Sequence, residues 1–306
     1  MKLTTLRALI ATIEEGSLRS GARRMQISQP ALTKMVRELE LELATTLLVR
    51  TSKGVLPTAQ GTVLYQRALA VCKELGTAVD EINQLGGKMV GSLHIGAVPL
   101  AVMLLIPETL RTFGREFPEI QLRVSEELYQ AQMQRLRNGH VDIAVGGIPT
   151  GLSSGEFVVE PLLQTSMVVV VRKGSPLASA TSLQQLMGAK WVYTGASNDT
   201  GYAKLLFESN GLPAPPVGAI VNSTLALLSL VATGDFVGLM PQQIATHPMA
   251  APFLSLVPLA EGGFPLTVGA IVRSDSVLSP AIRHCIAHLH RAAHQLSRQS
   301  AGTLLP

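Results

Sequence analysis

Residues 17–50 read SLRSGARRMQISQPALTKMVRELELELATTLLVR, and this stretch decides the fold of the N-terminal part of the chain. Two short helical patterns are separated by a polar break. The second pattern has apolar residues at spacings of four, three and four, which predicts one buried face (Leu32, Val36, Leu39 and Leu43). Ser28 is a suitable N-cap, and Pro30 falls in the first turn, where a missing N–H costs nothing. The stretch therefore predicts a helix-turn-helix whose second helix can enter a DNA major groove.

Charge is concentrated in the same part of the chain. Residues 1–58 hold nine Lys/Arg and five acidic side chains, so their net charge of +4 equals that of all 306 residues. A basic end on a neutral body suits attraction to DNA phosphates. Residues 50–54 (RTSKG) resemble a hairpin tip with two cations, which predicts a wing. The candidate DNA contacts are Ser28, Gln29, Pro30, Thr33, Lys34, Arg37, Arg50 and Lys53. An ordinary amphipathic helix with a solvated charged face is the alternative.

A longer helix is predicted after the wing. Apolar residues recur there every 3.5 residues over three heptads, at Leu64, Ala68, Val71, Leu75, Ala78, Ile82 and Leu85. Thr58 is a suitable N-cap, and Gly86-Gly87 ends the pattern. Such a repeat is typical of a helix that packs lengthwise on a partner, so these residues are the candidate dimer contacts. Packing of the helix on its own domain is the alternative.

From residue 89 the sequence pattern changes: short apolar runs alternate with helical patterns. Strands are predicted at 93–98, 120–124, 141–145, 158–163, 167–171, 190–193, 217–221, 236–240 and 266–272. Helices are predicted at 104–117, 129–138, 182–187, 200–210, 225–232 and 280–299. This alternation indicates parallel sheets covered on both faces. The length of the segment favours two α/β lobes with a ligand cleft between them.

Several classes of function lack support in the sequence. There is no run of 18 apolar residues and no signal-peptide pattern, so we expect a cytoplasmic protein without a membrane partner. Cys72 and Cys285 are too isolated for a disulfide framework or a metal site. An aromatic content of 4% disfavours binding of single-stranded nucleic acid by stacking. Gly146-Gly147 follows a strand, but the sequence after it is not that of a phosphate loop.

Histidines crowd the last predicted helix, at positions 284, 288, 290 and 294. Pairs spaced by four could chelate a metal in principle. His284 and His288 lie opposite the apolar stripe formed by Ile282, Ile286, Leu289, Ala293 and Leu296, so a solvated face explains them. We therefore expect no metal site, no cofactor and no catalytic set.

The chain resembles LysR-type transcriptional regulators from residue 2 to about residue 296. The N-terminal motifs are specific: EGSL at 15–18, Ala22, ISQPALT at 27–33, RELE at 37–40, LLVR at 47–50, Gly54-Val55 and TAQG at 58–61. GSLHIG at 91–96, FP at 117–118, LRNG at 136–139, DIA at 142–144, PLA at 176–178 and GLMP at 238–241 match more loosely. Three positions depart from the usual pattern: Ala44 replaces Gly, Leu48 replaces Phe, and Pro57 replaces an aliphatic residue.

The resemblance implies three parts. They are an all-α winged helix-turn-helix domain (1–58), a linker helix that forms an antiparallel dimer (59–88), and a two-lobed α/β effector domain like periplasmic binding proteins (89–306). Lobe I should comprise about 90–162 and 268–300, and lobe II about 163–267. The expected partners are double-stranded DNA, a small-molecule effector and a second copy of the chain. Further assembly to a tetramer is also expected, with RNA polymerase as another candidate partner.

The effector should bind between the lobes, near helix N-termini that favour anions. Val98, Pro99 and Leu100 replace the hydroxyl residues often found on the first cleft loop, so an apolar wall is expected there. The candidate polar contacts are Ser197, Asn198, Thr200, Asn222, Ser223 and Thr224, for which capping and turn formation is an equal alternative. The leading hypothesis is a ligand-responsive transcriptional regulator. The second is a solute-binding or enzymatic α/β protein whose N-terminal helices serve partner contacts.

Overall fold

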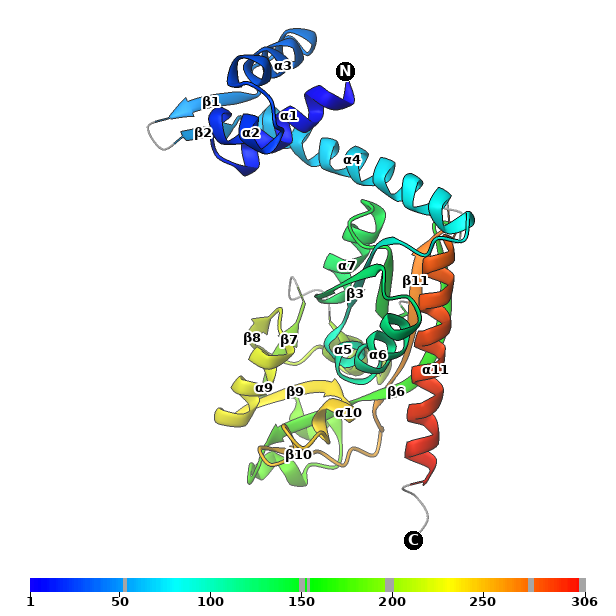
Figure 1. The fold of residues 1–306 in the computed structure, drawn as a ribbon. Coiled ribbons are helices and arrows are strands. Elements are labelled where there is room, and N and C mark those ends of the chain that lie inside the picture. Colours follow the sequence, from blue (N-terminus) through cyan, green and yellow to red (C-terminus); the bar gives the residue numbers. More distant parts are fainter. Residues whose placement is uncertain (52–53, 149–151, 153–154, 196–200, 275–277, 303–306) are drawn as a thin grey trace. The chain divides into compact units, whose positions relative to one another are not determined.

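The computed structural model describes residues 1–306 except 52–53, 149–151, 153–154, 196–200, 275–277 and 303–306 (Figure 1). The chain forms two compact units, Met1–Asn83 and Gln84–Pro306. Among the described residues, no helix is both long enough and apolar enough to cross a membrane.

The first unit contains three short helices, a hairpin and the start of a long helix. They are α1 (Leu3–Glu14), α2 (Leu18–Arg24), α3 (Gln29–Glu42), β1 (Leu48–Thr51), β2 (Gly54–Pro57) and α4 (Ala59–Leu85). The helix-turn-helix and the wing are therefore present. Ser28 caps α3 as predicted, since its Oγ accepts a hydrogen bond from the amide of Ala31 at 3.3 Å. Lys53, which the sequence predicts at the tip of the wing, lies outside the described residues.

The inner face of α3 is shorter than predicted. Leu32, Val36 and Leu39 are buried, but Leu43 is 39% exposed because the helix ends at Glu42 and Leu43 is its C-cap. Ala44 follows with a φ of +48°. This left-handed conformation is unfavourable for a residue with a Cβ and costs a glycine nothing. The position where the LysR-type pattern that the chain resembles usually has Gly is thus the position where the backbone turns left-handed.

The start of α4 is fixed by an N-cap and by a hydrogen bond to Leu47. The Thr58 Oγ1 accepts a hydrogen bond from the amide of Gly61 at 2.9 Å, which confirms the predicted N-cap. The amide of Thr58 donates to the carbonyl of Leu47 at 2.9 Å. A Cβ built on Gly61 would lie 2.0 Å from the same carbonyl oxygen. Only glycine therefore allows the first turn of α4 to cross so closely over Leu47.

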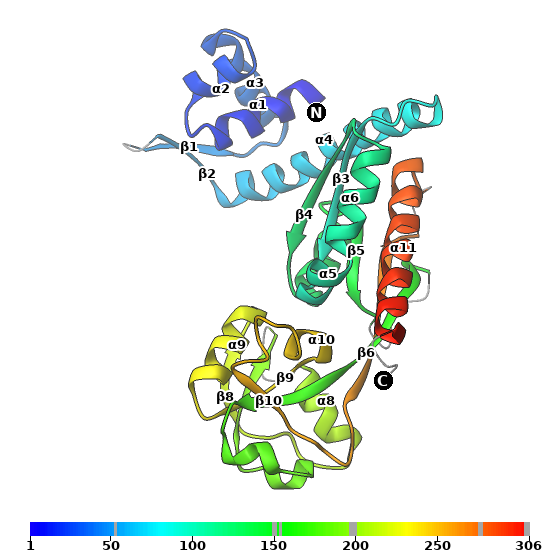
Figure 2. The same ribbon diagram turned by 60° about the horizontal axis from the view of Figure 1, so that its bottom comes forward.

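The second unit is built on a nine-stranded sheet with the order β4-β3-β5-β11-β6-β9-β7-β8, and β10 pairs with β6. The strands are β3 (Gly91–Ala97), β4 (Ile120–Glu126), β5 (Ile143–Gly147), β6 (Phe157–Arg172), β7 (Lys190–Thr194), β8 (Val217–Val221), β9 (Phe236–Pro241), β10 (Leu254–Leu256) and β11 (Phe264–Arg273). Strand β5 pairs with residues 268–271 of β11, whereas β9 pairs with residues 167–170 of β6. We call the structure around β3, β4 and β5 lobe I and that around β7, β8 and β9 lobe II. Figure 2 shows β6 passing from one lobe to the other.

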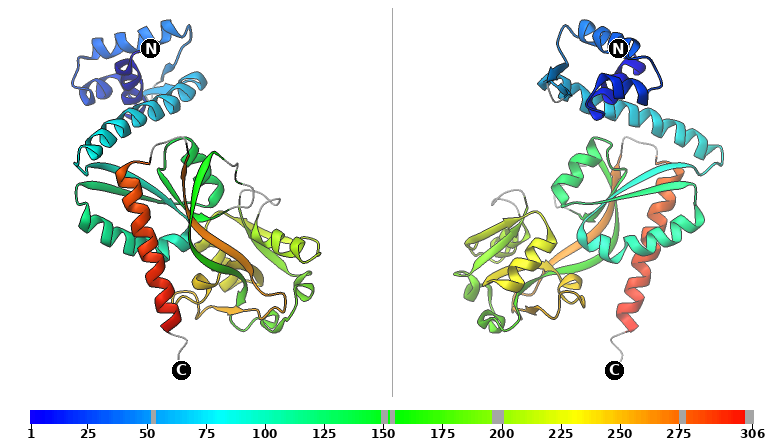
Figure 3. Two further views of the ribbon diagram at one scale, coloured as in Figure 1. Left: turned by 90° about the vertical axis from the view of Figure 1, so that its right-hand side faces the viewer. Right: turned by 60° about the vertical axis from the view of Figure 1, so that its left-hand side comes forward.

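The helices of the second unit cover the sheet on both sides. They are α5 (Pro99–Leu104), α6 (Ile106–Glu116), α7 (Tyr129–Arg137), α8 (Tyr202–Ser209), α9 (Thr224–Thr233), α10 (Gln242–Ala245) and α11 (Pro280–Gly302), with 3-10 turns η1 (Pro176–Ser179) and η2 (Leu183–Leu186). Helix α11 packs on α6 and runs along lobe I (Figure 3).

Three predictions for this unit are corrected. The strands expected at 158–163 and 167–171 are one strand, β6, because its middle pairs continuously with β11 apart from one irregularity at Val268/Gly269. The sheet is mixed: β3, β4 and β5 are parallel, as are β7, β8 and β9, but β6, β10 and β11 run antiparallel to their neighbours. The helix expected at 104–117 is preceded by α5, which begins at Pro99.

Candidate DNA interface and ligand-binding region

The exposed side of α3 forms the wall of an open groove of about 1250 Å³. Its lining includes five of the predicted DNA contacts, Gln29, Pro30, Thr33, Lys34 and Arg37, and continues over Glu38, Glu40, Leu41, Ala44, Thr45 and Thr46. The hydroxyl of Thr33 donates to the carbonyl of Gln29 at 2.9 Å, which orients that side chain on the helix surface. The structure thus brings together the polar side chains that the sequence placed near the helix start.

The five acidic side chains of residues 1–58 are engaged within this segment. Glu14 and Glu15 lie 2.5 and 3.5 Å from the Arg24 guanidinium, and the hydrogen bond and charge of Glu14 raise the pKa of Arg24. The Glu38 Oε1 lies 3.9 Å from the Lys34 Nζ, and the Glu42 carboxylate pairs with the N-terminal amine. Glu40 accepts hydrogen bonds from the amides of Leu47 and Leu48 at 2.8 and 3.3 Å.

These ion pairs divide the arginines of residues 1–58 into paired and unpaired ones. Within the part of the chain that the structure describes, five arginines of residues 1–58 are exposed and have no ion-pair partner: Arg7, Arg19, Arg23, Arg37 and Arg50. Arg37 lies on the groove and Arg50 on the wing, as predicted. Sequence reasoning missed Arg19 and Arg23 on α2, because charge alone does not separate them from the paired Arg24. Unpaired guanidinium groups are the donors that phosphate contacts require.

The apolar stripe of α4 divides into two parts. Ala68 is 1% exposed and, with the half-buried Leu64, packs on the core of the first unit, so these two predicted dimer contacts are explained by packing within their own domain. The rest of the helix carries exposed apolar side chains: Val71 (46%), Leu75 (46%), Val79 (58%), Ile82 (70%) and Leu85 (72%). Ala78 is also exposed. Such a run of exposed large apolar residues marks an interaction surface.

The predicted apolar wall of the effector site is only partly present. Val98 is the N-cap of α5 and half-buried, as is Pro99, but Leu100 is 2% exposed and packs in the core. Leu100 is therefore corrected from a ligand contact to a core residue, because it lies in the first turn of α5 and points inward. On the other side, Ser197, Asn198 and Thr200 lie outside the described residues.

The Asn222–Thr224 loop leads into α9. The Ser223 Oγ accepts a hydrogen bond from the amide of Ala226 at 3.4 Å, so this residue serves as the N-cap, which was its alternative role. Asn222 is exposed and Thr224 is half-buried in the first turn. Both remain accessible to a ligand.

A close approach of the two lobes at Gly147 was not predicted, and Gly146 beside it packs within lobe I. A Cβ on Gly146 would lie 2.9 Å from the Val98 side chain and 3.4 Å from Gln132 Oε1. A Cβ on Gly147 would lie 2.7 Å from the hydroxyl of Tyr202 at the start of α8. The glycine pair, which lacks the sequence of a phosphate loop, marks this close approach of lobe II to the end of β5. Helices α5 and α8 both begin here, and among the described residues no side chain caps either helix start.

The histidines of α11 do not share one environment. His284 and His290 are exposed, but His288 is 1% exposed, so its predicted solvated position is wrong. Helix α6 covers that side of α11: His288 Nδ1 lies 2.7 Å from the Thr112 hydroxyl, and the ring meets Phe113 edge-on. Burial lowers the pKa of His288. Among the described residues, no group of three or more His, Cys, Asp or Glu side chains is placed to hold a metal ion.

The cysteines are also dissimilar. Cys285 is buried, and burial raises the pKa of its thiol to about 12, so the reactive thiolate is suppressed. Cys72 lies half-buried against the core of the first unit.

Two family descriptions match the chain. Residues 3–62 match "Bacterial regulatory helix-turn-helix protein, lysR family", and residues 86–294 match "LysR substrate binding domain". Curated relatives are similar over most of their length. The chain is 29% identical to the HTH-type transcriptional regulator GalR of Pseudomonas putida over 285 residues, which cover 90% of this chain and 70% of that protein. It is 26% identical to GbpR of Azospirillum brasilense over 304 residues, which cover 98% of this chain and 89% of that protein.

Solved structures show the same fold. CbnR, a LysR family transcriptional regulator, superposes with a TM-score of 0.70 at 19% identity, covering 96% of this chain and 99% of that one. Full-length CbnR in complex with its target DNA gives a TM-score of 0.71 at 19% identity, covering 95% of this chain and 100% of that one. The arrangement of a helix-turn-helix unit, a long helix and a two-lobed α/β unit is therefore shared.

Proposed function

This chain belongs to the LysR family of DNA-binding transcriptional regulators, which are not enzymes, and we propose that it reads a specific operator as a dimer under the control of a small organic anion. The observation that carries the DNA assignment is the groove along α3, where Gln29, Thr33 and the unpaired Arg37 share one exposed surface. Side chains at the start of a recognition helix reach base edges, whereas cations on a wing reach phosphates. Ser28, Pro30, Lys34, Arg50 and Lys53 complete the proposed contact surface.

The domain roles follow the same proposal. Residues 1–58 bind DNA, residues 59–88 join two copies, and residues 89–306 sense the effector. The dimer surface consists of Val71, Leu75, Ala78, Ile82 and Leu85, which are the exposed part of the stripe. Family membership further supports assembly of dimers into a tetramer, contact with RNA polymerase and action in the cytoplasm, where operator DNA is found.

The DNA surface is tested by two substitutions in the groove. We expect Gln29→Ala and Thr33→Ala to reduce the preference for the operator over a shuffled duplex, each by about 1–3 kcal/mol, since each removes a base-edge contact. Fluorescence anisotropy at one fixed salt concentration measures both affinities. Gln66→Ala, an exposed change on α4, is the control. Unchanged discrimination in both groove variants would contradict the assignment of α3 as the reading element.

The proposed effector site lies where Val98, Gly146, Gly147 and Tyr202 meet, with Pro99, Asn222 and Thr224 as further candidate contacts. The proposal also retains Ser197, Asn198 and Thr200. Val98 offers an apolar wall, Tyr202 brings a phenol, and the positive N-terminal end of α8 favours a negative group. A small organic acid with an apolar part fits this chemistry. A ligand that contacts both lobes favours one arrangement by its differential affinity, which is how binding can alter the DNA-bound state.

Effector binding is tested by a thermal-shift screen of small organic acids. A ligand at 100 times its dissociation constant should stabilise the protein by roughly 2.7 kcal/mol. We expect Val98→Trp to abolish that stabilisation because the larger indole would occupy the proposed site that Val98 borders, while operator affinity without ligand is unchanged. Met249→Trp, at a site that is 76% exposed, is the control. A full response in Val98→Trp would place the sensing site elsewhere.

A further inference from the structure

We propose that Gln84, near the end of α4, is the positioning residue that couples the lobes of the second unit to the dimer helix. Its side chain makes the last turn of α4 part of the second unit, so a change in the arrangement of the lobes reaches α4 through it. This inference rests on the proposed function and deepens it, since it names a residue through which effector binding acts on the DNA-bound state.

Gln84 is buried in a part of α4 whose other residues are half-buried or exposed. It is 7% exposed, whereas Leu85 is 72% exposed, and it is the first buried residue of α4 after Ala68. Both ends of its amide have a partner. Nε2 donates a hydrogen bond to the carbonyl of Val90 at 3.0 Å, and Oε1 accepts one from the amide of Ala281 at 3.2 Å. A buried amide that is paired at both ends has one fixed orientation, so it holds its partners more specifically than an apolar side chain does.

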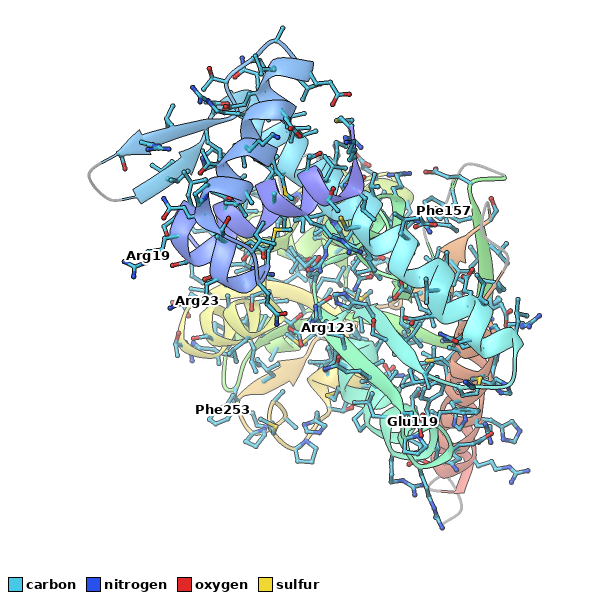
Figure 4. The ribbon with its side chains drawn as sticks, turned by 45° about the horizontal axis from the view of Figure 1, so that its top comes forward. Arg19, Arg23, Glu119, Arg123, Phe157 and Phe253 are labelled. Carbon is cyan, nitrogen blue, oxygen red and sulfur yellow. The ribbon has the colours of Figure 1, made fainter. Side chains whose placement is uncertain are left out.

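The two partners of Gln84 belong to segments that are far apart in the sequence. Val90 precedes β3, and Ala281 lies in the first turn of α11. Figure 4 shows the end of α4, the cyan helix, beside the start of α11. Gly86 and Gly87 separate Gln84 from Val90, and Gly87 has a φ of +87°. This glycine pair resembles a flexible hinge in the sequence, but the side chain of Gln84 spans it and holds the turn closed.

The start of α11 uses the acceptor that Gln84 supplies. The first amides of a helix have no partner within the helix itself. The Ser279 Oγ accepts a hydrogen bond from the amide of Ile282 at 3.3 Å, and the Gln84 Oε1 accepts one from the preceding amide, that of Ala281. Ser279 and Ala281 are 6% and 3% exposed, so solvent has little access to this helix start. Gln84 therefore acts as a second N-cap, supplied from another helix, and joins α4 to α11.

Both segments that Gln84 holds lead to the proposed effector site. Strand β3 lies between β4 and β5, and the residue that follows it is Val98, which borders the site. The amide of Val98 donates to the carbonyl of Val145 in β5 at 2.9 Å. Helix α11 packs on α5 and α6, and α5 begins at Pro99. Packed elements of this kind carry coupling between sites, so a shift of Val98 and Pro99 reaches Gln84 by two routes, along β3 and along α11.

A role confined to helix capping is the alternative. A cap alone stabilises the second unit, but it does not decide whether a change at the lobes alters α4. Such a change can be introduced without a ligand at Gly147. A Cβ there would lie 2.7 Å from the Tyr202 hydroxyl and 2.8 Å from the Cδ1 of Leu266, so Gly147→Ala disturbs the approach of lobe II to β5.

The experiment is a double-variant cycle in the full-length protein, with Gly147→Ala, Gln84→Met and the pair. Methionine has the length of glutamine but makes neither hydrogen bond. Gln66→Met, the same substitution at an exposed position of α4, is the control. Hydrogen exchange of residues 79–85 reports on α4, and fluorescence anisotropy gives the affinity for an operator selected from a random library. Both are measured below the thermal transition of every variant. If Gly147→Ala leaves the exchange around Tyr202 unchanged, Gly147→Val replaces it.

We expect Gly147→Ala to change both the exchange of α4 and the operator affinity by at least about 5-fold in the wild-type and Gln66→Met backgrounds. In the Gln84→Met background, both changes should fall below about 2-fold, the range within which independent substitutions add. Equal effects of Gly147→Ala with and without Gln84, in either readout, would overturn the proposal, and so would the absence of any effect on α4. If the wild-type protein selects no operator, the proposed function fails, whereas hydrogen exchange, which needs no DNA, still decides whether Gln84 couples the lobes to α4.

Discussion

Leu75→Glu is expected to yield a folded monomer that binds its operator at least about 100-fold more weakly than the wild type. Leu75 lies in the middle of the exposed apolar part of α4 and is itself 46% exposed. In a helix pair, this position would be enclosed by the partner, where a carboxylate without a counter-ion is costly. Loss of the pair removes the second half-site contact and hence the gain from simultaneous binding. Sedimentation equilibrium gives the mass, and anisotropy gives the affinity.

Gln66→Glu is the matched control for this prediction. It introduces the same charge on an exposed position of the same helix, off the stripe. We expect it to remain dimeric. If Leu75→Glu sediments as an intact dimer, the stripe is not the joining surface, and its exposed apolar residues need another partner.

The second large effect is expected from Gly61→Ala. The added methyl group would lie 2.0 Å from the carbonyl oxygen of Leu47 and 2.9 Å from its carbon, so the backbone must move. That movement breaks the hydrogen bond from the Thr58 amide to the same oxygen, which joins the wing segment to α4. We expect the first unit to lose about 3 kcal/mol or more of unfolding free energy, as overpacking and a lost buried hydrogen bond act together. Thermal denaturation followed by circular dichroism measures the change.

Gly76→Ala serves as the control in the same helix. Nothing lies within 4 Å of a Cβ at Gly76, so the substitution should stabilise the helix by about 0.8–1.0 kcal/mol. Opposite signs for the two glycines are the prediction. Similar stabilisation in both variants would show that α4 does not cross Leu47 as closely as described.

The first unit was largely predictable because its signals are local. The N-caps Ser28 and Thr58, the buried stripe of α3 and the end of α4 at Leu85 all depend on residues within a few positions of one another. Only the helix ends differed. Leu43 reads as a continuation of the stripe, yet it is the C-cap, because Ala44 turns left-handed.

The second unit was less predictable because its pairing is long-range. The sequence of β6 resembles two strands, since nothing in it reveals that β11 pairs across the polar residues between the two apolar runs. Strand β10 is stabilised by pairing with β6. It has only three residues, so its apolar pattern is too short to predict a strand from the sequence. The strand direction depends on partners far along the chain, which explains why an all-parallel sheet was expected.

The site residues were likewise predictable where they depend on local sequence, and not where they depend on tertiary packing. The groove on α3 and the wing follow from the motif. In contrast, the division of the α2 arginines into paired and unpaired ones depends on which carboxylates lie near them, and that is a tertiary property. Tyr202 approaches Gly147 from 55 positions away in sequence, and only the glycine pair hinted at a close contact. His288 was misassigned because helical spacing identifies one buried face of α11, whereas packing against α6 buries a second.

The central claim is that this chain is a dimeric, sequence-specific DNA-binding regulator. Selection of duplexes from a random-sequence library by the full-length protein, followed by measurement of affinity at one fixed salt concentration, tests it most directly. We predict enrichment of a two-fold symmetric sequence whose half-sites are separated by about one helical turn, 10–10.5 base pairs, or a multiple of it. The enriched duplex should bind at least about 1,000-fold more tightly than its shuffled counterpart. Equal affinity for the two duplexes, or enrichment of no common sequence, would contradict the account.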